Sequence, residues 1–222
     1  AGVGLIGLML TAIAMSTLIA QRSLAAHVSA VADALDVGGL AAGRRAVSHI
    51  VGRDPDRLDE AGVARAAIES LAENFSYGVT APSFWLALLG PIGGVAYKTL
   101  NNADSIIGNK TPSYEDLGRA AAPLEDLANQ PASRLIGAVI NGAAALTPGA
   151  SPKAACRAIR RDAAGHRSLN AGWPEAAVAG ALGFSLAGPR VYDGALSKDA
   201  EMNAGGRRDL DAADIRRALS LY

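Results

Sequence analysis

The order of hydrophobic and polar residues divides the chain into blocks that are typical of helices. The first block, Ala1 to Ala20, has no charged residue, and Gln21 and Arg22 end it. A helix of this length would cross the ~30 Å apolar core of a bilayer. A secretory signal peptide would show a basic start and a cleavage pattern, and neither is present. The pattern therefore predicts a transmembrane helix over residues 1–20.

Residues 21–78 are predicted to form polar helices. Apolar residues at helical spacing predict an amphipathic helix over Ser23–Leu35, and the sequence DVGGL ends it. A second short helix is predicted over Ala41–Val51. The polar turn that contains Asp54 and Pro55 then marks a boundary.

The next predicted helix, Val63–Asn74, carries a row of charge. At 3.6 residues per turn, Arg65, Glu69 and Glu73 fall on one face at i, i+4 steps. Turn-forming residues over 74–78 should end this helix. Arg65 and Glu69 could equally form an exposed ion pair of ~0.3–0.5 kcal/mol, with Glu73 solvated. Both interpretations stay open: a polar site at a helix end, or a solvated face.

Two later apolar segments are too broken or too short to be straight spans. Residues 79–97 are interrupted by Pro82, Pro91 and two glycines, which predicts a kinked, short or re-entrant helix that begins at Pro82. The run Leu135–Leu146 could be a buried helix or half of a hairpin. If neither segment crosses fully, the polar groups between them can reach the row of charge, and we favour that arrangement.

Polar residues gather again between these apolar segments. Lys98, Asn101 and Asp104 should share one face of a helix that a turn over residues 109–112 ends. A helix over Tyr114–Ala128 should follow. It presents Asp126 and Asn129 near its end, and Pro131 is expected to close it before Arg134.

The C-terminal part begins with a basic helix and ends with a short soluble one. The basic helix carries Lys153, Arg157, Arg160 and Arg161, and His166 and Arg167 follow it. The sequence Trp173-Pro174-Glu175 is typical of a helix start, where the helix dipole favours an anion. A Gly- and charge-rich loop from Pro189 should lead into a last helix over Ala212–Tyr222.

Together these patterns predict an all-α fold: a multipass helical membrane protein with short, broken or re-entrant apolar helices and amphipathic cytoplasmic helices. We expect one domain, residues 1–222, with a transmembrane helix (1–20), polar helices (21–78), apolar and polar helices (79–148) and the C-terminal helices (149–222). The basic helix suggests that the polar face is cytoplasmic. Because the chain starts inside an apolar run without an initiator methionine, we expect an upstream portion and more spans.

Composition narrows the class of function. Half of the residues are hydrophobic but only 5% are aromatic, and the 25 glycines suit closely packed helices. Basic and acidic residues both number 21, so no overall positive charge argues for a nucleic-acid partner. The single cysteine, Cys156, excludes an internal disulfide and a cysteine metal cluster. His27 and His49 have no second ligand at i+3 or i+4 and are interpreted as structural.

Common catalytic signatures are missing. The sequence has no P-loop, no GxGxxG, no HExxH and no GxSxG. P-loop NTPases, Rossmann dehydrogenases, zincins and α/β-hydrolases therefore lose their usual support. Carboxylates, amides and arginines concentrated at helix ends would suit an anionic, polar substrate.

Four ordered motifs resemble the cobinamide synthase family of cobalamin biosynthesis, also called adenosylcobinamide-phosphate synthase or CobD/CbiB. They are ARAAIESLAENFSYGVTAPSFW, AYKTLNNADSIIG, DLANQPASRL and HRSLNAGWPEAAVAGAL. The resemblance covers most of the chain from about His27. It implies a membrane enzyme of the cell (inner) membrane that joins aminopropanol, or its O-phosphate, to a propionate carboxylate of (adenosyl)cobyric acid. The carboxylate would be activated by ATP with Mg²⁺, and other late corrinoid enzymes could be partners.

The resemblance also suggests site residues. We expect Glu69, Glu73 and Asp104 to act in metal or amine binding and as general bases, with Glu73 and Asp104 as metal ligands. Amide formation needs an activated carboxylate and an amine that has lost its proton. The residues expected to bind and orient substrates are Asn74, Ser76, Lys98, Asn101, Asp126, Asn129, Arg134, Arg167, Asn170 and Glu175.

Two positions depart from the family pattern. The family usually reads ENFSDG, whereas this chain has Tyr77 in place of the acid, and it usually reads SPNAG where this chain has Leu169 in place of proline. If that acid binds metal or orients the amine, Tyr77 cannot replace it, because a phenol is neutral near pH 7 and larger. Two other functions stay open: a membrane transporter, which also uses broken helices, and a non-catalytic membrane scaffold of the late corrinoid pathway.

Overall fold

The computed structural model describes residues 2–52, 54–107, 115–189, 191–192, 195–196 and 199–222, and most of these residues are helical. The long helices are α1 (Gly2–Ser16), α2 (Gln21–Val47), α3 (Glu60–Phe75), α4 (Ala81–Ile107), α5 (Glu115–Ala144), α6 (Pro152–Asp162), α7 (Gly172–Leu182) and α8 (Ala212–Leu221). Single turns of 3-10 helix lie at Pro55–Arg57 and Ala163–Gly165. The helical class that the sequence predicts is confirmed.

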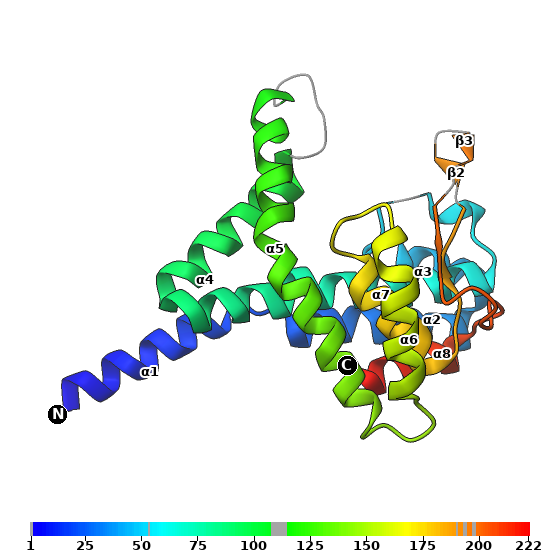
Figure 1. Cartoon of the computed structure of the whole chain (residues 1–222), viewed down its shortest axis with the longest axis horizontal. Coiled ribbons are helices and arrows are strands. Elements are labelled where there is room, and N and C mark those ends of the chain that lie inside the picture. The colour runs from blue at the N-terminus through cyan, green and yellow to red at the C-terminus, as the bar shows by residue number, and fades with distance from the viewer. Residues whose placement is uncertain (1, 53, 108–114, 190, 193–194, 197–198) are drawn as a thin grey trace.

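The molecule consists of a helical bundle and an extended arm (Figure 1). Helices α2, α3, α6, α7 and α8 pack around a core rich in small residues, and α5 runs from this bundle out along α4. The core tolerates little extra volume: a Cβ on Gly180 of α7 would lie 2.6 Å from the carbonyl oxygen of Ala154. The many alanines and glycines thus serve close helix packing, as the composition suggests.

Capping residues explain why several helices begin where they do. The Asp59 side chain accepts a hydrogen bond from the backbone N–H of Gly62 at 2.7 Å, which starts α3. Asp211 and Asp214 form a reciprocal capping box at the start of α8. The predicted helices over Val63–Asn74 and Ala212–Tyr222 are therefore confirmed within a few residues.

The two predicted helices over residues 23–35 and 41–51 are one kinked element. Helix α2 bends at Gly39, which has φ 63° and ψ −162°. The break that DVGGL predicts is present, but it does not end the helix, because glycine adopts the left-handed region without a steric penalty. The second half ends at Val47, earlier than the predicted Val51.

The predicted turn over residues 74–78 is wrong. Helix α3 passes into a π-helical turn, Ser76–Thr80, and then directly into α4. A π-helical turn accommodates one extra residue within a continuous helix, so α3 continues into α4 without a loop. The predicted kink in the next apolar segment is confirmed: α4 bends at Gly90 (φ 67°), just before Pro91. Proline cannot continue the helical hydrogen bonds, and glycine allows the bend.

The prediction that Pro131 ends a helix is also wrong. Helix α5 contains both Pro123 and Pro131 and continues to Ala144, so the Leu135–Leu146 run is its second half. Side chains supply donors near the break: Trp85 Nε1 donates to the carbonyl oxygen of Ala128 at 3.0 Å, a compensation known for prolines within helices. The predicted turn at 109–112, and the predicted helix start at Tyr114, lie outside the described residues.

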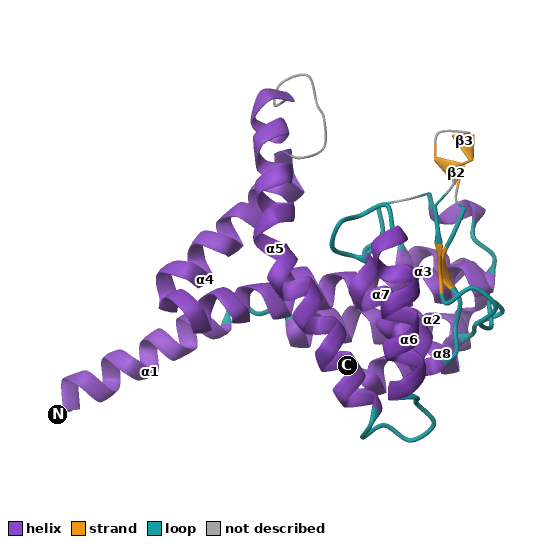
Figure 2. Ribbon diagram, in the orientation of Figure 1, coloured by secondary structure: helices purple, strands orange, loops and turns teal. Residues whose placement is uncertain are grey.

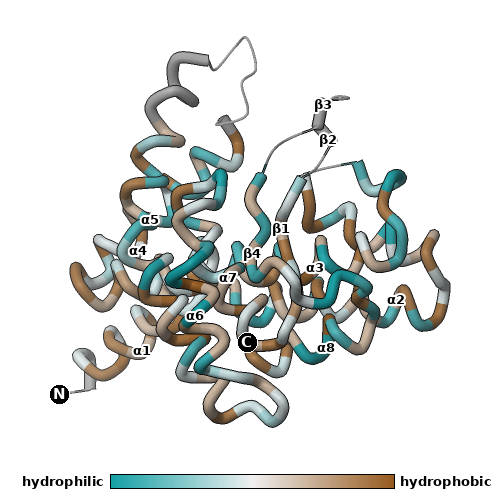
Figure 3. The backbone as a smooth tube through the Cα atoms, turned by 45° about the vertical axis from the view of Figure 1, so that its right-hand side comes forward, coloured by the Kyte–Doolittle hydropathy of each residue, from teal (hydrophilic) through white to brown (hydrophobic). Residues whose placement is uncertain are grey.

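Two helical stretches, Gly4–Val47 and Glu60–Ile106, are long and apolar enough to cross a membrane. The predicted span over residues 1–20 is shortened, since α1 ends at Ser16. Its leucines and isoleucines are largely exposed, with Leu8 at 67% and Ile13 at 63%. In Figure 3 much of α1 is coloured brown for hydrophobic residues.

Two pairs of two-residue strands are described in and just before the predicted C-terminal loop (Figure 2). Strand β1 (Leu186–Ala187) pairs antiparallel with β4 (Glu201–Met202), and β2 (Val191–Tyr192) pairs with β3 (Ala195–Leu196). The all-α prediction missed these pairs, which are too short to produce an alternating pattern.

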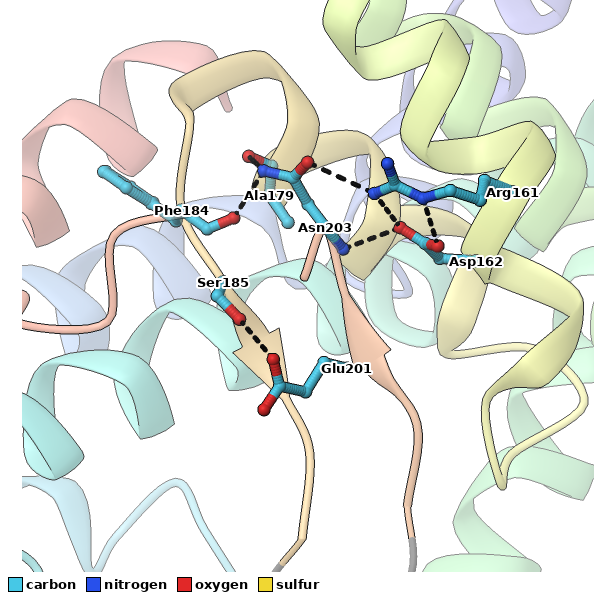
Figure 4. Close-up of polar contacts among 7 residues, drawn as sticks. All are labelled: Arg161, Asp162, Ala179, Phe184, Ser185, Glu201 and Asn203. Carbon is cyan, nitrogen blue, oxygen red and sulfur yellow. Dashed lines mark hydrogen bonds and ion pairs between the residues drawn. The ribbon is translucent and has the colours of Figure 1, made fainter. Parts of the chain in front are cut away.

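Asn203 anchors this segment to α6 and α7 (Figure 4). Its backbone N–H donates to Asp162 Oδ2 at 2.7 Å, and its Nδ2 donates to the carbonyl oxygens of Phe184 (2.8 Å) and Ala179 (3.3 Å). Arg161 pairs with Asp162 and also donates to Asn203 Oδ1. One side chain therefore joins the end of β4 to the ends of two helices.

Candidate functional site

Three cavities meet at the C-terminal end of α3, and Glu73 lines all of them. The acidic cavity, about 310 Å³, lies between α3, α4 and α5. The loop cavity, about 600 Å³, lies between α3 and the loop 166–168. The outer cavity, about 910 Å³, reaches the start of α2 and the end of α4. Polar residues that are far apart in the sequence are thus brought together here.

Among the residues whose side chains the structure describes, the lining of the acidic cavity has four carboxylates and no basic group. These residues are Glu73, Asn74, Tyr77, Asn101, Asp104, Ser105, Ala122, Glu125 and Asp126. Helices α3, α4 and α5 each contribute, so the kinked course of α4 and the long α5 bring them to one place. A space of this chemistry suits a small cation such as an ammonium group.

Glu125 is the most buried of these carboxylates, with 2% of its surface exposed. Its Oε1 accepts hydrogen bonds from the Tyr97 hydroxyl at 2.9 Å and from Asn101 Nδ2 at 3.3 Å. Burial raises the pKa of Glu125 to about 7, Asp104 and Asp126 add to the rise, and the two hydrogen bonds oppose it. Lys98 Nζ donates to Asn101 Oδ1 at 3.2 Å and so positions that amide.

The loop cavity combines acidic and basic groups. His166 and Arg167 line it together with Glu73 and Glu175. His166 Nδ1 lies 3.0 Å from the backbone nitrogen and 3.3 Å from the carbonyl oxygen of Ser168, so the loop holds the ring in place. Nε2 lies 3.7 Å from Glu175 Oε2. The structure brings Arg167 and Glu175 to the cavity that the α3 carboxylates Glu69 and Glu73 also line.

Glu69 also lines the loop cavity, but its carboxylate has a structural role, because it binds a backbone N–H. It is 6% exposed, and its Oε1 accepts a hydrogen bond from the backbone N–H of Ala187 at 2.8 Å. Ala187 has φ 55°, a left-handed conformation that is unfavourable for alanine. Glu69 thus fixes the end of β1 beside the cavity.

Several predicted site residues line none of these three cavities: Ser76, Asn129, Arg134 and Asn170. The first two are buried and bonded to each other, from Ser76 Oγ to Asn129 Oδ1 at 3.3 Å. Arg134 lies over the Trp173 ring, 5.0 Å from its centre. Asn170 lies behind the acidic cavity, where its Nδ2 donates to Asp126 Oδ1 at 3.1 Å and so orients that carboxylate.

The sequence interpretation missed Glu125, Tyr97, His166 and Asp199. Helical spacing could have identified Glu125, because it lies four residues before the buried Asn129 and so on the inner face of α5. His166 and Asp199 lie in loops, where spacing predicts no common face. Only the folded chain brings them to the loop cavity.

The predicted metal site finds no support in the arrangement of side chains. Within the described residues, no three His, Cys, Asp or Glu side chains are grouped so that they could hold a metal ion. Glu73 and Asp104 do line two cavities together. They could provide one or two carboxylates to an ion that arrives with a phosphorylated ligand, which is the usual mode for Mg²⁺.

Comparisons with known proteins agree with the family resemblance that the four sequence motifs indicate. The family model described as "CobD/Cbib protein" matches residues 1–222. A "Cobalamin biosynthesis protein CobD" from Sinorhizobium fredii is 53% identical over 220 residues, 99% of this chain and 68% of that protein. Proteins of the same name from Rhizobium meliloti (52%; 99% and 67%) and Rhodobacter capsulatus (49%; 92% and 63%) are also similar.

The matches extend over nearly the whole chain but over only about two thirds of these relatives. No solved structure matches the chain. The full-length family match, together with relatives near 50% identity, shows that the chain belongs to the CobD/CbiB family of cobalamin biosynthesis proteins.

Proposed function

We propose that this protein forms an amide bond between an amine and a corrinoid carboxylate. The amine is aminopropanol or its O-phosphate, and the acceptor is a propionate side chain of (adenosyl)cobyric acid, giving (adenosyl)cobinamide (phosphate). The observation that carries the proposal is the acidic cavity, which is small, rich in carboxylates and joined to a cavity with basic groups through Glu73. Family membership supplies the pathway.

The two adjoining cavities suit the two substrates differently. An ammonium group is favoured near the carboxylates of the acidic cavity. Arg167 in the loop cavity and Lys98 in the outer cavity offer positive charge to a carboxylate or phosphate. Asn74 and Asn101 line both the acidic and the outer cavity and can orient the amine by hydrogen bonds.

ATP and Mg²⁺ belong to the proposal as the source of activation. A carboxylate is a poor electrophile, and transfer of a phosphoryl group to it would supply a leaving group. Glu73 and Asp104 are the residues we assign to a Mg²⁺ ion that is bound with the nucleotide phosphates.

Tyr77 lies at the centre of the proposed site. It lines the acidic and outer cavities, and its side chain forms a hydrogen bond with Ser168 of the α6–α7 loop. The phenol can therefore fill space and hold the loop, but it supplies no negative charge near pH 7. We expect Tyr77→Asp to raise the rate of amide formation if the missing charge limits this protein. A scaffold that never catalysed the reaction would stay inactive after this change.

The site would face the cytoplasm at the inner membrane, with α1 and the apolar first part of α4 in the bilayer, while the polar end of α4 lines the site. The exposed Leu5, Leu8 and Leu88 would then contact lipid instead of water. The basic residues of α6 fit the cytoplasmic side of this arrangement.

The proposal is tested by amide formation in two variants and a control. Glu73→Gln removes a charge shared by all three cavities, and Asn101→Ala removes the amide that contacts Glu125. We expect at least a tenfold loss of rate in both. Asp33→Asn changes an exposed ion pair with Arg216, neither residue of which lines the three cavities, and should leave the rate unchanged. Wild-type rates in both site variants would refute the proposed site.

A further inference from the structure

The structure singles out one carboxylate of the acidic cavity by its fixed geometry. Glu125 is almost fully buried and yet lines the cavity. Tyr97 and Asn101, both on α4, hold its Oε1 from two directions. Both donors are uncharged, and the described Lys98 reaches Asn101 and not the carboxyl group itself, so these contacts position Glu125 without forming an ion pair.

We propose that Glu125 is the general base that accepts a proton from the substrate ammonium before its nitrogen attacks the activated carboxylate. This inference rests on the proposed function and assigns a role within it. Because Tyr97 and Asn101 both bind Oε1, we assign Oε2 of the same group to the amine. Amines bind strongly to carboxylates through charge-assisted hydrogen bonds.

In this proton-transfer and attack step, one proton passes from the ammonium nitrogen to Glu125, and the freed electron pair on the nitrogen forms the C–N bond. The bond between the acyl carbon and the phosphate oxygen breaks, and its electrons leave with the phosphate. The second proton that the nitrogen must lose goes to the released phosphate or to water.

The surroundings keep this group suited to proton transfer near neutral pH. Glu73, Asp104, Asp126 and Tyr77 line the same cavity, Tyr97 donates to Glu125, and Lys98 donates to Asn101 beside it; these are the titratable groups near Glu125 among the described residues. Burial, with the charges of Asp104 and Asp126, raises the pKa of Glu125 to about 7, so the carboxyl group can both accept and release a proton at that pH. A base matched to the working pH typically contributes about 10²–10⁴-fold in rate.

The test compares two nucleophiles in Glu125→Gln. Glutamine keeps an acceptor for Tyr97 and Asn101 but cannot take a proton. We expect amide formation with aminopropanol at pH 7 to fall by about 10²-fold or more. Hydroxylamine is uncharged at pH 7 and needs no base, so corrinoid hydroxamate should form at the wild-type rate. The wild-type amide rate should fall below about pH 7, and this pH dependence should disappear in the variant.

Each other outcome has a distinct meaning. Amide formation at the wild-type rate in Glu125→Gln would overturn the assignment. Loss of both products in the variant would show a structural role for Glu125 and would also overturn it. Failure of the wild-type protein to form either product would instead refute the proposed function itself. Asp33→Asn serves again as the surface control.

Discussion

Asn203 gives the sharpest test of how the C-terminal segment is held in place (Figure 4). It adopts φ 58°, and its Nδ2 donates to carbonyl oxygens at the end of α7 and at Phe184. Asparagine tolerates this left-handed backbone better than most residues, while glycine adopts it freely. Replacement by alanine and by glycine therefore separates the cost of the lost hydrogen bonds from the cost of the backbone conformation.

The magnitudes follow from the contacts. Both variants lose the two hydrogen bonds that Nδ2 donates, at about 0.5–1.5 kcal/mol each, and the long, exposed one from Arg161 to Oδ1, which adds little. Asparagine already has a Cβ at this position, so Asn203→Ala adds only the loss of the local hydrogen bonds that let asparagine adopt the left-handed region, at most about 1–2 kcal/mol. We expect Asn203→Ala to lower the free energy of unfolding by about 1–5 kcal/mol. The glycine variant should be more stable than the alanine variant by about 1 kcal/mol, because its greater freedom in the unfolded chain offsets part of the difference.

Urea unfolding of the detergent-purified protein, followed by tryptophan fluorescence, measures these differences. Trp173 begins α7, the helix to whose end Asn203 donates, so its emission reports on this region. Equal stability of the alanine and glycine variants would show that the backbone conformation carries no strain. Wild-type stability in both would refute the anchoring role.

Three further predictions concern other contacts. Glu69→Gln keeps an acceptor for the Ala187 N–H and should retain most activity. Glu69→Ala leaves that buried donor unpaired, which should lower the free energy of unfolding by about 1–3 kcal/mol. If both variants were equally inactive, Glu69 would again be a candidate catalytic acid or base. Gly180→Ala should destabilise the protein, because its Cβ would meet the α6 backbone at 2.6 Å; an unchanged melting temperature would contradict this packing. Burial alone would raise the pKa of Asp214, but hydrogen bonds from Arg207 and from the Asp211 backbone hold it below its usual range. This stability is present above the unfolded pKa and is lost as pH falls through the folded pKa, so urea midpoints below pH 4 should depend less on pH in Asp214→Asn.

The sequence predicts well wherever local chemistry determines the structure. The motif Trp173-Pro174-Glu175 begins α7, as expected. Helices α3 and α8 begin after the capping residues Asp59 and Asp211. The kinks at Gly39 and Gly90 follow from glycine in the left-handed region. In these places, neighbouring residues alone decide the backbone conformation.

The sequence fails as a guide where distant residues compensate for a local break. Pro131 does not end α5, and the indole of Trp85 donates to the Ala128 carbonyl oxygen in the turn before it. The charged row of α3 does not act as one site either. Arg65 donates to the Arg208 carbonyl oxygen, Glu69 binds Ala187, and Glu73 alone lines all three cavities. Helical spacing predicts a shared face but not which partner reaches each side chain.

The prediction of a common pocket rested on α4 and α5 returning their polar residues to the end of α3. Glu73, Asp104 and Asp126 do share the acidic cavity. Arg134 does not take part, because it lies over the Trp173 ring, and Asn129, although on the inner face of α5, is buried against Ser76. We selected these residues because they lie in the sequence motifs, and a motif does not show in which direction a side chain points from its helix.

The most direct measurement is the mass of the product formed by the purified protein. The reaction contains cobyric acid, ATP and Mg²⁺, with aminopropanol or its O-phosphate as the amine. We predict a corrinoid whose mass equals the sum of acid and amine less one water, with one of the two amines strongly preferred. Unchanged cobyric acid with both amines, from a protein that retains its fold, would contradict amide formation as the function of this protein.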